Sequence, residues 1–173
     1  MSSRPSCWPL LGRAQRWATW VGATTLLALA GLVACGDEPA VDASGARELL
    51  ARVQADSYRS WSRAPGWASR APSLGGGHGG QLDIYVNARL ASSLQSEQPV
   101  VVVPEGAIIV KDVWRGAELH ALAIMEKRVD GWYWAEFDGA GQVSAGGHPD
   151  GCIACHRRGA DFVRAFDLRS PPD

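Results

Sequence analysis

The chain has 173 residues, with 17 lysines and arginines against 18 aspartates and glutamates, and 46% of its residues are hydrophobic. A nucleic-acid-binding surface calls for clustered basic residues, and this nearly balanced composition offers none, so we expect no nucleic-acid partner. The length suits one folded domain behind a targeting segment.

Residues 1–34 have the pattern of a secretory signal of the lipoprotein type. Three arginines precede an apolar run from Trp17 to Ala34, and small residues stand directly before Cys35. This order is typical of exported proteins, and its end resembles the lipobox of bacterial lipoproteins, whose cysteine is lipidated. We favour cleavage before Cys35 over a retained signal anchor, although the run approaches the roughly 18 residues that span a bilayer. The mature protein is expected to be lipid-anchored to a bacterial membrane and to face the periplasm.

Residues 35–43 are polar and without periodicity, which predicts a tether in front of a domain over residues 44–173. Apolar residues from Ala46 to Val53 recur at helical spacing, and a serine at position 44 is available as N-cap, so we predict a helix to about Asp56. Between Arg59 and Gly80 the prolines and a run of glycines predict a long irregular loop.

Runs rich in β-branched and aromatic residues predict four strands, over Leu82–Val86, Ala107–Val113, Glu118–Lys127 and Trp132–Phe137. Asp130-Gly131 stands between the last two and predicts a hairpin. A short helix is expected over Ala88–Gln95.

The five residues from Cys152 to His156 read Cys-Ile-Ala-Cys-His, the attachment motif of c-type haem. Thiols at Cys152 and Cys155 lie on one helical turn and can each add to a haem vinyl group, and His156 then binds the iron axially. A disulfide, a zinc site or a redox dithiol are the alternatives. Zinc needs about four ligands, and only His148 lies near enough in sequence to add one. We favour one covalently bound haem c per chain, which agrees with export.

The predicted fold class is therefore α+β. It comprises a β-rich, mostly antiparallel sheet with an N-terminal helix and a C-terminal haem-bearing CxxCH helix. A tail with apolar residues follows.

Lys111 shares a strand face with Ala107 and Ile109 by alternation. From periodicity alone we interpret it as a solvated lysine whose stem crosses apolar surface. The remaining candidates are given ordinary roles: loop, solvated or core positions for His78, His120, His148, Met125, Trp132 and Trp134, and a solvated pair for Arg157 and Arg158.

The order of several short motifs resembles that of the cytochrome P-460 family, which includes the cytochromes c′-beta. These motifs are Tyr58-Arg59-Ser60-Trp61, His78-Gly79, Ile84 to Asn87, Glu105-Gly106 with Ile109-Val110-Lys111, Trp132 to Glu136, and the CxxCH motif. The resemblance covers roughly residues 44–166. It implies a β-rich α+β domain, a homodimer, and a five-coordinate haem with an open distal face.

The resemblance also gives Lys111 a second interpretation. In the cytochromes P-460 proper, the lysine at this motif position is joined covalently to the haem edge and supports hydroxylamine oxidation. Those enzymes share a distal glutamate, but the matching stretch Ala121–Met125 contains no carboxylate, and Glu118 and Glu126 only flank it. This departure weighs against hydroxylamine oxidation, because deprotonation of a bound substrate needs a base about 3 Å away.

The sequence therefore leaves three functions open. The protein oxidises or binds small nitrogen compounds such as hydroxylamine or nitric oxide as a lipid-anchored mono-haem cytochrome. Alternatively, it is a non-catalytic nitric-oxide-binding protein like the cytochromes c′-beta, or a plain electron carrier, for which Met125 or a second histidine would have to fill the sixth position. A redox partner protein is expected in each case.

Overall fold

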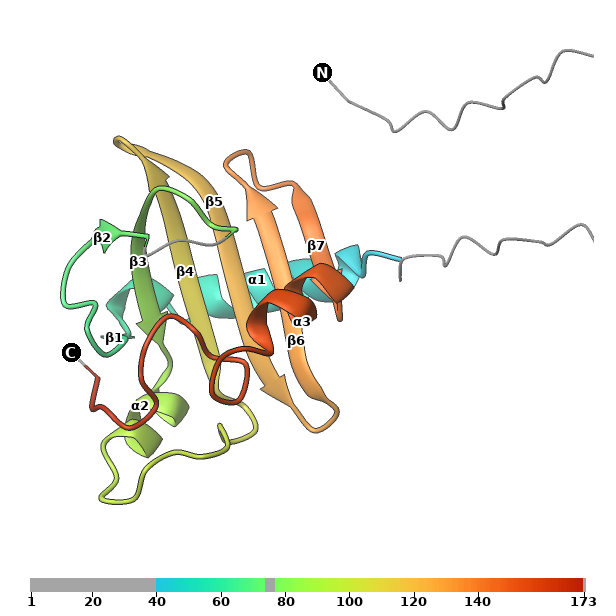
Figure 1. Ribbon diagram of the computed structural model, residues 1–173. Coiled ribbons are helices and arrows are strands. Elements are labelled where there is room, and N and C mark those ends of the chain that lie inside the picture. The colour runs from blue at the N-terminus through green and yellow to red at the C-terminus, as the bar shows by residue number, and fades with distance from the viewer. Residues whose placement is uncertain (1–39, 74–76, 173) are drawn as a thin grey trace, which may run out of the picture. The chain divides into compact units, whose positions relative to one another are not determined.

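A computed structural model describes residues 40–73 and 77–172 of the protein (Figure 1). Seven strands form one antiparallel sheet in the order β1-β3-β4-β5-β6-β7, and β2 pairs with β3 beside β1. This confirms the predicted α+β class and its antiparallel sheet. In chain order the elements are α1 (Ala43–Ala55), a 3-10 turn (Tyr58–Ser60), β1 (Ser62–Arg63), β2 (Ala71–Pro72), β3 (Gln81–Val86), α2 (Ala88–Leu94), β4 (Ile108–Arg115), β5 (Glu118–Arg128), β6 (Gly131–Asp138), β7 (Val143–Gly147) and α3 (Asp150–His156).

The four predicted strands are β3 to β6, each within about two residues of its expected bounds. β5 and β6 pair up to Arg128 opposite Gly131, so the chain turns over Val129 and Asp130. The predicted hairpin is confirmed. Gly131 follows the turn with a φ of 122°, a conformation that residues with a Cβ rarely adopt.

Helix α1 lies behind the sheet in Figure 1 and packs against its rear face. Its buried side chains Ala46, Leu49 and Val53 recur at helical spacing and contact apolar residues of the central strands. The predicted cap is wrong by two residues. The carboxylate of Asp42, not Ser44, accepts the backbone N–H of Gly45 at 2.9 Å, so the helix begins at Ala43.

Two buried carboxylates lie side by side on the same face, because Asp83 of β3 pairs with Asp112 of β4. The hydroxyl of Tyr58 and the Nε of Arg59 each donate to Asp112 at 2.8 Å. Two further arginines hold Asp83 at 2.6 and 3.0 Å. Buried carboxylates need such partners, and these bonds fasten residues 58–70 to the two strands.

The prediction of one irregular loop over Arg59–Gly80 is wrong in part, since this stretch contains β1, β2 and the end of the 3-10 turn. Two-residue strands carry no periodicity and form only because β3 offers them a partner. β7 was not predicted either. Its sequence, Val-Ser-Ala-Gly-Gly, is poor in strand-forming residues, and it is ordered by pairing with β6.

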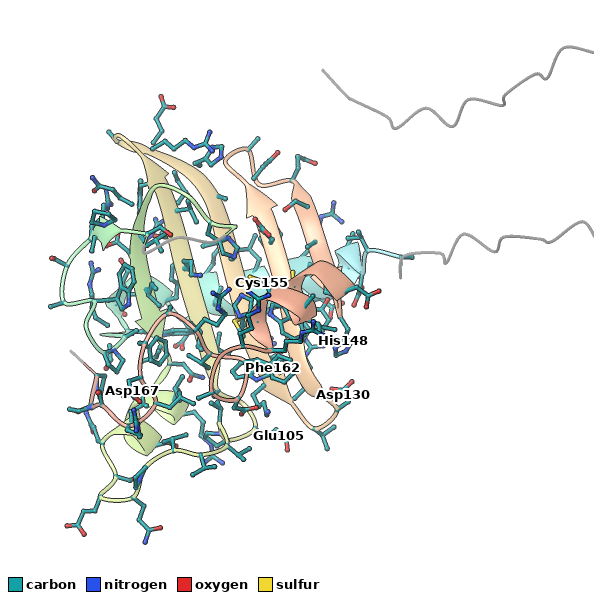
Figure 2. The ribbon with its side chains drawn as sticks, in the orientation of Figure 1. Glu105, Asp130, His148, Cys155, Phe162 and Asp167 are labelled. Atoms are coloured by element: carbon teal, nitrogen blue, oxygen red, sulfur yellow. The ribbon has the colours of Figure 1, made fainter. Side chains whose placement is uncertain are left out.

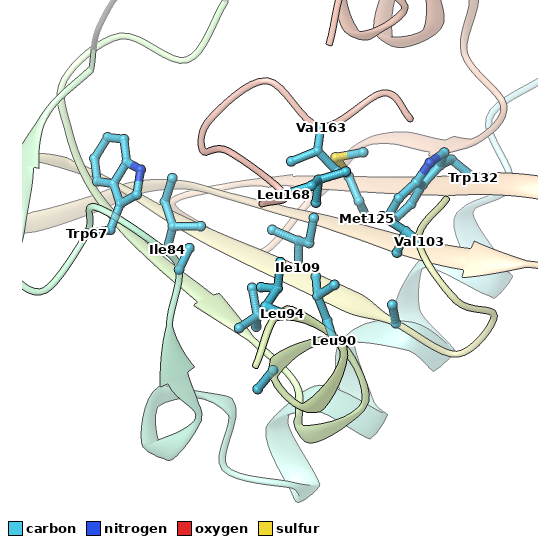
Figure 3. Close-up of a cluster of buried hydrophobic side chains, with 14 of the residues drawn as sticks. Trp67, Ile84, Leu90, Leu94, Val103, Ile109, Met125, Trp132, Val163 and Leu168 are labelled. Atoms are coloured by element: carbon cyan, nitrogen blue, oxygen red, sulfur yellow. The ribbon is translucent and has the colours of Figure 1, made fainter. Parts of the chain in front are cut away.

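The other face of the sheet carries a second apolar core, shown in Figure 3. Ile84, Ile109 and Met125 rise from the strands and meet Leu90 and Leu94 of α2. The chain after α3 crosses in front of this face in Figure 1 and adds Val163 and Leu168 to the core, as well as the partly buried Phe162 and Phe166. In Figure 1 this arrangement places α3 in front of β6 and β7.

Within residues 40–73 and 77–172, no helix combines the length and apolar character that crossing a bilayer requires. The predicted signal over residues 1–34 and the lipidation site Cys35 lie outside the described residues. So does most of the predicted tether, residues 35–43.

Candidate functional site

A pocket lies between the middle of the sheet and the segment that follows β7. Its cavity volume is about 190 Å³, and its empty space is about 880 Å³ when the open mouth is included. β4, β5 and β6 form one wall, and α3 with the segment after it forms the other. The lining residues are Gly77, His78, Ile109, Lys111, Ala123, Ile124, Met125, Trp134, Ala135, Glu136, Gly151, Cys152, Cys155, His156, Val163, Arg164, Ala165 and Phe166.

The three residues of the CxxCH motif that bear functional groups lie on α3 and line this pocket together. Cys152 and Cys155 are half-buried free thiols one helical turn apart. Burial, followed by the nearby Glu136 and Cys155, raises the pKa of the Cys152 thiol. The guanidinium of Arg164 lies 2.8 Å from the sulfur of Cys155. Figure 2 shows Cys155 and Phe162 on the segment that crosses the sheet.

The imidazole of His156 is oriented by a backbone hydrogen bond. Its Nδ1 lies 2.8 Å from the carbonyl oxygen of Phe162. A carbonyl only accepts, so Nδ1 carries the proton and Nε2 is left as the nitrogen with a free lone pair. A neutral histidine with this tautomer is the form that binds a metal through Nε2.

Lys111 lines the same pocket, and its interpretation as a solvated lysine is wrong. Burial lowers the pKa of its amine to about 8, partly offset by the carboxylate of Glu136. The register explains the placement. Lys111 pairs with Ala123 of β5, and Ala123 pairs with Glu136 of β6, so the three side chains form one row on the pocket face. Because the side chain of Ala123 is small, the side chains of Lys111 and Glu136 on either side of it have room in the pocket.

Glu136 is the pocket residue that sequence reasoning missed. Burial raises the pKa of its carboxyl group, with Lys111 acting in the opposite direction. The resemblance implies a glutamate on β5 instead, but Glu118 there is exposed, and Glu126 points to the α1 face, where Arg52 holds it at 2.7 Å. Alternation along β6 was the available signal, because Glu136 follows Trp134 by two residues and shares its face.

His78 also lines the pocket, although its sequence context indicated an ordinary loop histidine. Its Nδ1 lies 3.8 Å from a carboxylate oxygen of Glu136, too far for a direct hydrogen bond. Burial lowers the pKa of His78 to about 4, and Lys111 and His156 act in the same direction. The ring is therefore neutral near pH 7.

The other candidates lie where the sequence interpretation put them. His120, His148, Arg157 and Arg158 are exposed. Met125, Trp132 and Trp134 are buried in the core cluster, although Met125 and Trp134 also reach the pocket wall.

The residues of this pocket fit a covalently attached haem. They supply two thiols at the attachment spacing, a histidine with Nε2 available, and an apolar wall that includes Ile109 and Val163. The buried indole Nε1 of Trp134 has no hydrogen-bond partner within residues 40–73 and 77–172, so it is a donor open to a bound group. A closed zinc site fits less well, because no three histidine, cysteine or acidic side chains of the described residues are arranged so that together they could hold a metal ion.

Comparison with known proteins adds no assignment, since neither a protein-family model nor a curated protein matches the chain. The residues of the pocket are therefore the basis for a functional proposal.

Proposed function

We propose that this protein is a lipid-anchored mono-haem c-type cytochrome that oxidises or binds a small nitrogen compound, hydroxylamine or nitric oxide. One observation carries the proposal. The CxxCH residues, whose histidine has Nε2 available, share a pocket with Lys111, the residue that matches the cross-linking position of the cytochrome P-460 family. Under this proposal Cys152 and Cys155 hold haem c through thioether bonds, and His156 is the axial ligand.

Bound haem c would supply an iron with one open axial position, at which a small nitrogen compound can bind and exchange electrons. The chain's own groups would act around that position. Glu136 accepts a proton from an N–H or O–H group of the substrate, since its carboxylate faces the pocket and its raised pKa makes it a stronger base than an exposed glutamate. Ile109, Ala123 and Met125 exclude water beside it.

Lys111 would act as part of the haem site. Its lowered pKa leaves a larger neutral fraction of the amine than an exposed lysine has, and a neutral amine is the nucleophilic form. This would support a bond from Nζ to a carbon of the haem edge, in which one N–H and one C–H bond are lost and the two electrons and two protons pass to an oxidant such as a peroxide. Glu136 on β6 would take the role of the glutamate that β5 lacks, and its place in the pocket favours hydroxylamine oxidation.

Nitric oxide binding without catalysis is the second candidate. The apolar wall around Ile109 and Met125 favours it, because such a surface admits a small neutral ligand. The polar groups Lys111 and Glu136 favour oxidation instead. A plain electron carrier would need a sixth ligand for the iron. His78 is the candidate for that ligand, because it lines the same pocket as His156.

The absorption spectrum of the purified protein, combined with a tryptic digest, tests the proposal. If Lys111 is joined to the haem, the main band is strongly red-shifted, and one haem links the peptide of Cys152 and Cys155 to that of Lys111. Lys111→Ala should then restore an ordinary spectrum, while Lys127→Ala should not. An ordinary five-coordinate spectrum would leave nitric oxide binding as the function, and a six-coordinate spectrum that His78→Ala converts to five-coordinate would establish the carrier.

Location and partners complete the proposal. Lipidation at Cys35 would hold the domain at a bacterial membrane, facing the periplasm. There a redox partner protein would exchange electrons with it, and the domain would form a homodimer as the resemblance implies.

A further inference from the structure

The turn after α3 has an unusual backbone. Asp161 and Phe162 are consecutive residues with φ of 39° and 64°, in the left-handed region that residues with a Cβ seldom occupy. The turn is also tight, because a Cβ on Gly159 would collide with the carbonyl oxygen of Val163. Strain of this kind persists only where the surroundings hold it in place.

The side chain of Asp161 is held from two directions. The ammonium of Lys127, at the end of β5, donates to its two carboxylate oxygens at 2.8 and 3.0 Å. The backbone N–H of Val103 donates to the same carboxylate at 2.7 Å. Both charged side chains are mostly buried, with 16% and 12% of their surfaces exposed. A partly desolvated pair with a third hydrogen bond fixes geometry better than an exposed ion pair does.

The backbone of Asp161 is held as well, because the indole Nε1 of Trp132 donates to its carbonyl oxygen at 2.8 Å. Lys127 lies 5.3 Å from the centre of the same indole ring. Lys127 and Trp132 are partners across the β5–β6 hairpin. The end of this hairpin therefore holds one side of the left-handed turn.

The next residue in the turn is the one that contacts the histidine. The carbonyl of Phe162 accepts the Nδ1–H of His156 at 2.8 Å, so the position of this carbonyl sets both the tautomer and the plane of the ring. A hydrogen bond at Nδ1 makes Nε2 a stronger donor to a metal.

We propose that Lys127 and Asp161 are positioning residues for His156: they hold the left-handed turn whose Phe162 carbonyl orients the imidazole and strengthens it as an axial ligand. The inference rests on the proposed function, because it concerns the haem ligand. Neither residue contacts the pocket.

The test compares Lys127→Met, Asp161→Asn and Lys127→Arg with the wild-type haem protein. The readouts are the iron–histidine stretching frequency of the reduced protein, from resonance Raman spectroscopy, and the reduction potential. Lys127→Met and Asp161→Asn should each lower the stretching frequency and raise the potential, because a loosened carbonyl makes His156 a weaker donor. Lys127→Arg keeps the positive charge, so its stretching frequency and reduction potential should stay close to those of the wild type.

Arg52→Met is the matched control. It removes the cation from a different ion pair, which joins Arg52 of α1 to Glu126 of β5 on the face of the sheet away from the pocket. It should change neither readout. Hydrogen exchange of the Val103 amide reports whether the Asp161 bond has been lost in each variant. If the Lys127→Met and Asp161→Asn proteins fold and show faster exchange of the Val103 amide, but keep the wild-type frequency and potential, the inference is overturned. The proposed function is not affected by that result. A wild-type protein without covalent haem would overturn the proposed function and this inference with it.

Discussion

At the scale of single residues, Glu136 is the side chain whose replacement distinguishes the proposed hydroxylamine-oxidising enzyme from the proposed nitric-oxide-binding protein. Glu136→Gln keeps the size of the side chain and removes its basicity, so we expect hydroxylamine oxidation to fall by roughly 10²- to 10⁴-fold, the usual contribution of a general base. The base works only when ionised, and burial raises its pKa. The wild-type rate should therefore rise with pH through a range above that of an ordinary glutamate, and the variant should lack this rise.

Steady-state rates across pH check this expectation. Glu118→Gln is the control, because Glu118 is exposed on β5, and its replacement should leave the rate unchanged. A Glu136→Gln protein that retains both the wild-type rate and its pH profile would show that the proton goes elsewhere.

The residues of the site differ in how far the sequence predicts them. The spacing from Cys152 to His156 is local, so it identifies the motif without a fold. The burial of Lys111 is not local. Alternation gives the face of a strand but not which face is covered by α3, and the pairing of Lys111 with Ala123 and then Glu136 depends on strand register. Because strand register cannot be deduced from local sequence, the sequence predicts neither the burial of Lys111 nor the position of Glu136 beside it.

At the scale of elements, we expect one face of the sheet to contribute to stability through α1 and the other face to form the pocket. α1 packs on the face opposite the pocket, with Leu49 fully buried. Leu49→Ala should lower the free energy of unfolding by about 2–5 kcal/mol, since it leaves a cavity under the helix. It should not change the haem spectrum. Leu50→Ala, at a partly buried position, should cost less.

Denaturant unfolding and the absorption spectrum of each variant measure these two effects. A Leu49→Ala protein with an altered haem spectrum would show that the α1 face and the pocket are coupled through the sheet.

Elements that carry their own signal were predicted, and elements that depend on a partner were not. β3 to β6 are rich in β-branched and aromatic residues, and α1 has a regular apolar spacing. β1, β2 and β7 form only by pairing with β3 or β6. The cap of α1 was misplaced because Asp42 and Ser44 are both good N-caps, and the contact of Asp42 with Tyr133 of β6 at 2.9 Å favours the first.

The proposed location concerns the whole molecule, and under the proposal it depends on lipidation of Cys35. Fatty-acid labelling of the full chain in a bacterial host should mark the wild type, and Cys35→Ser should abolish the label and release the domain or block its processing. Cys7→Ser is the control, since Cys7 would be removed with the signal. Labelling that persists in Cys35→Ser would place the anchor at another residue.

Covalent haem attachment is the claim on which the whole account depends, and intact mass measures it most directly. Protein produced with a c-type maturation system should keep the mass of one haem per chain after acid extraction. The double variant Cys152→Ser with Cys155→Ser should have the mass of the bare chain, because it has neither thioether. A wild-type protein whose mass is that of the bare chain under the same conditions would contradict the account.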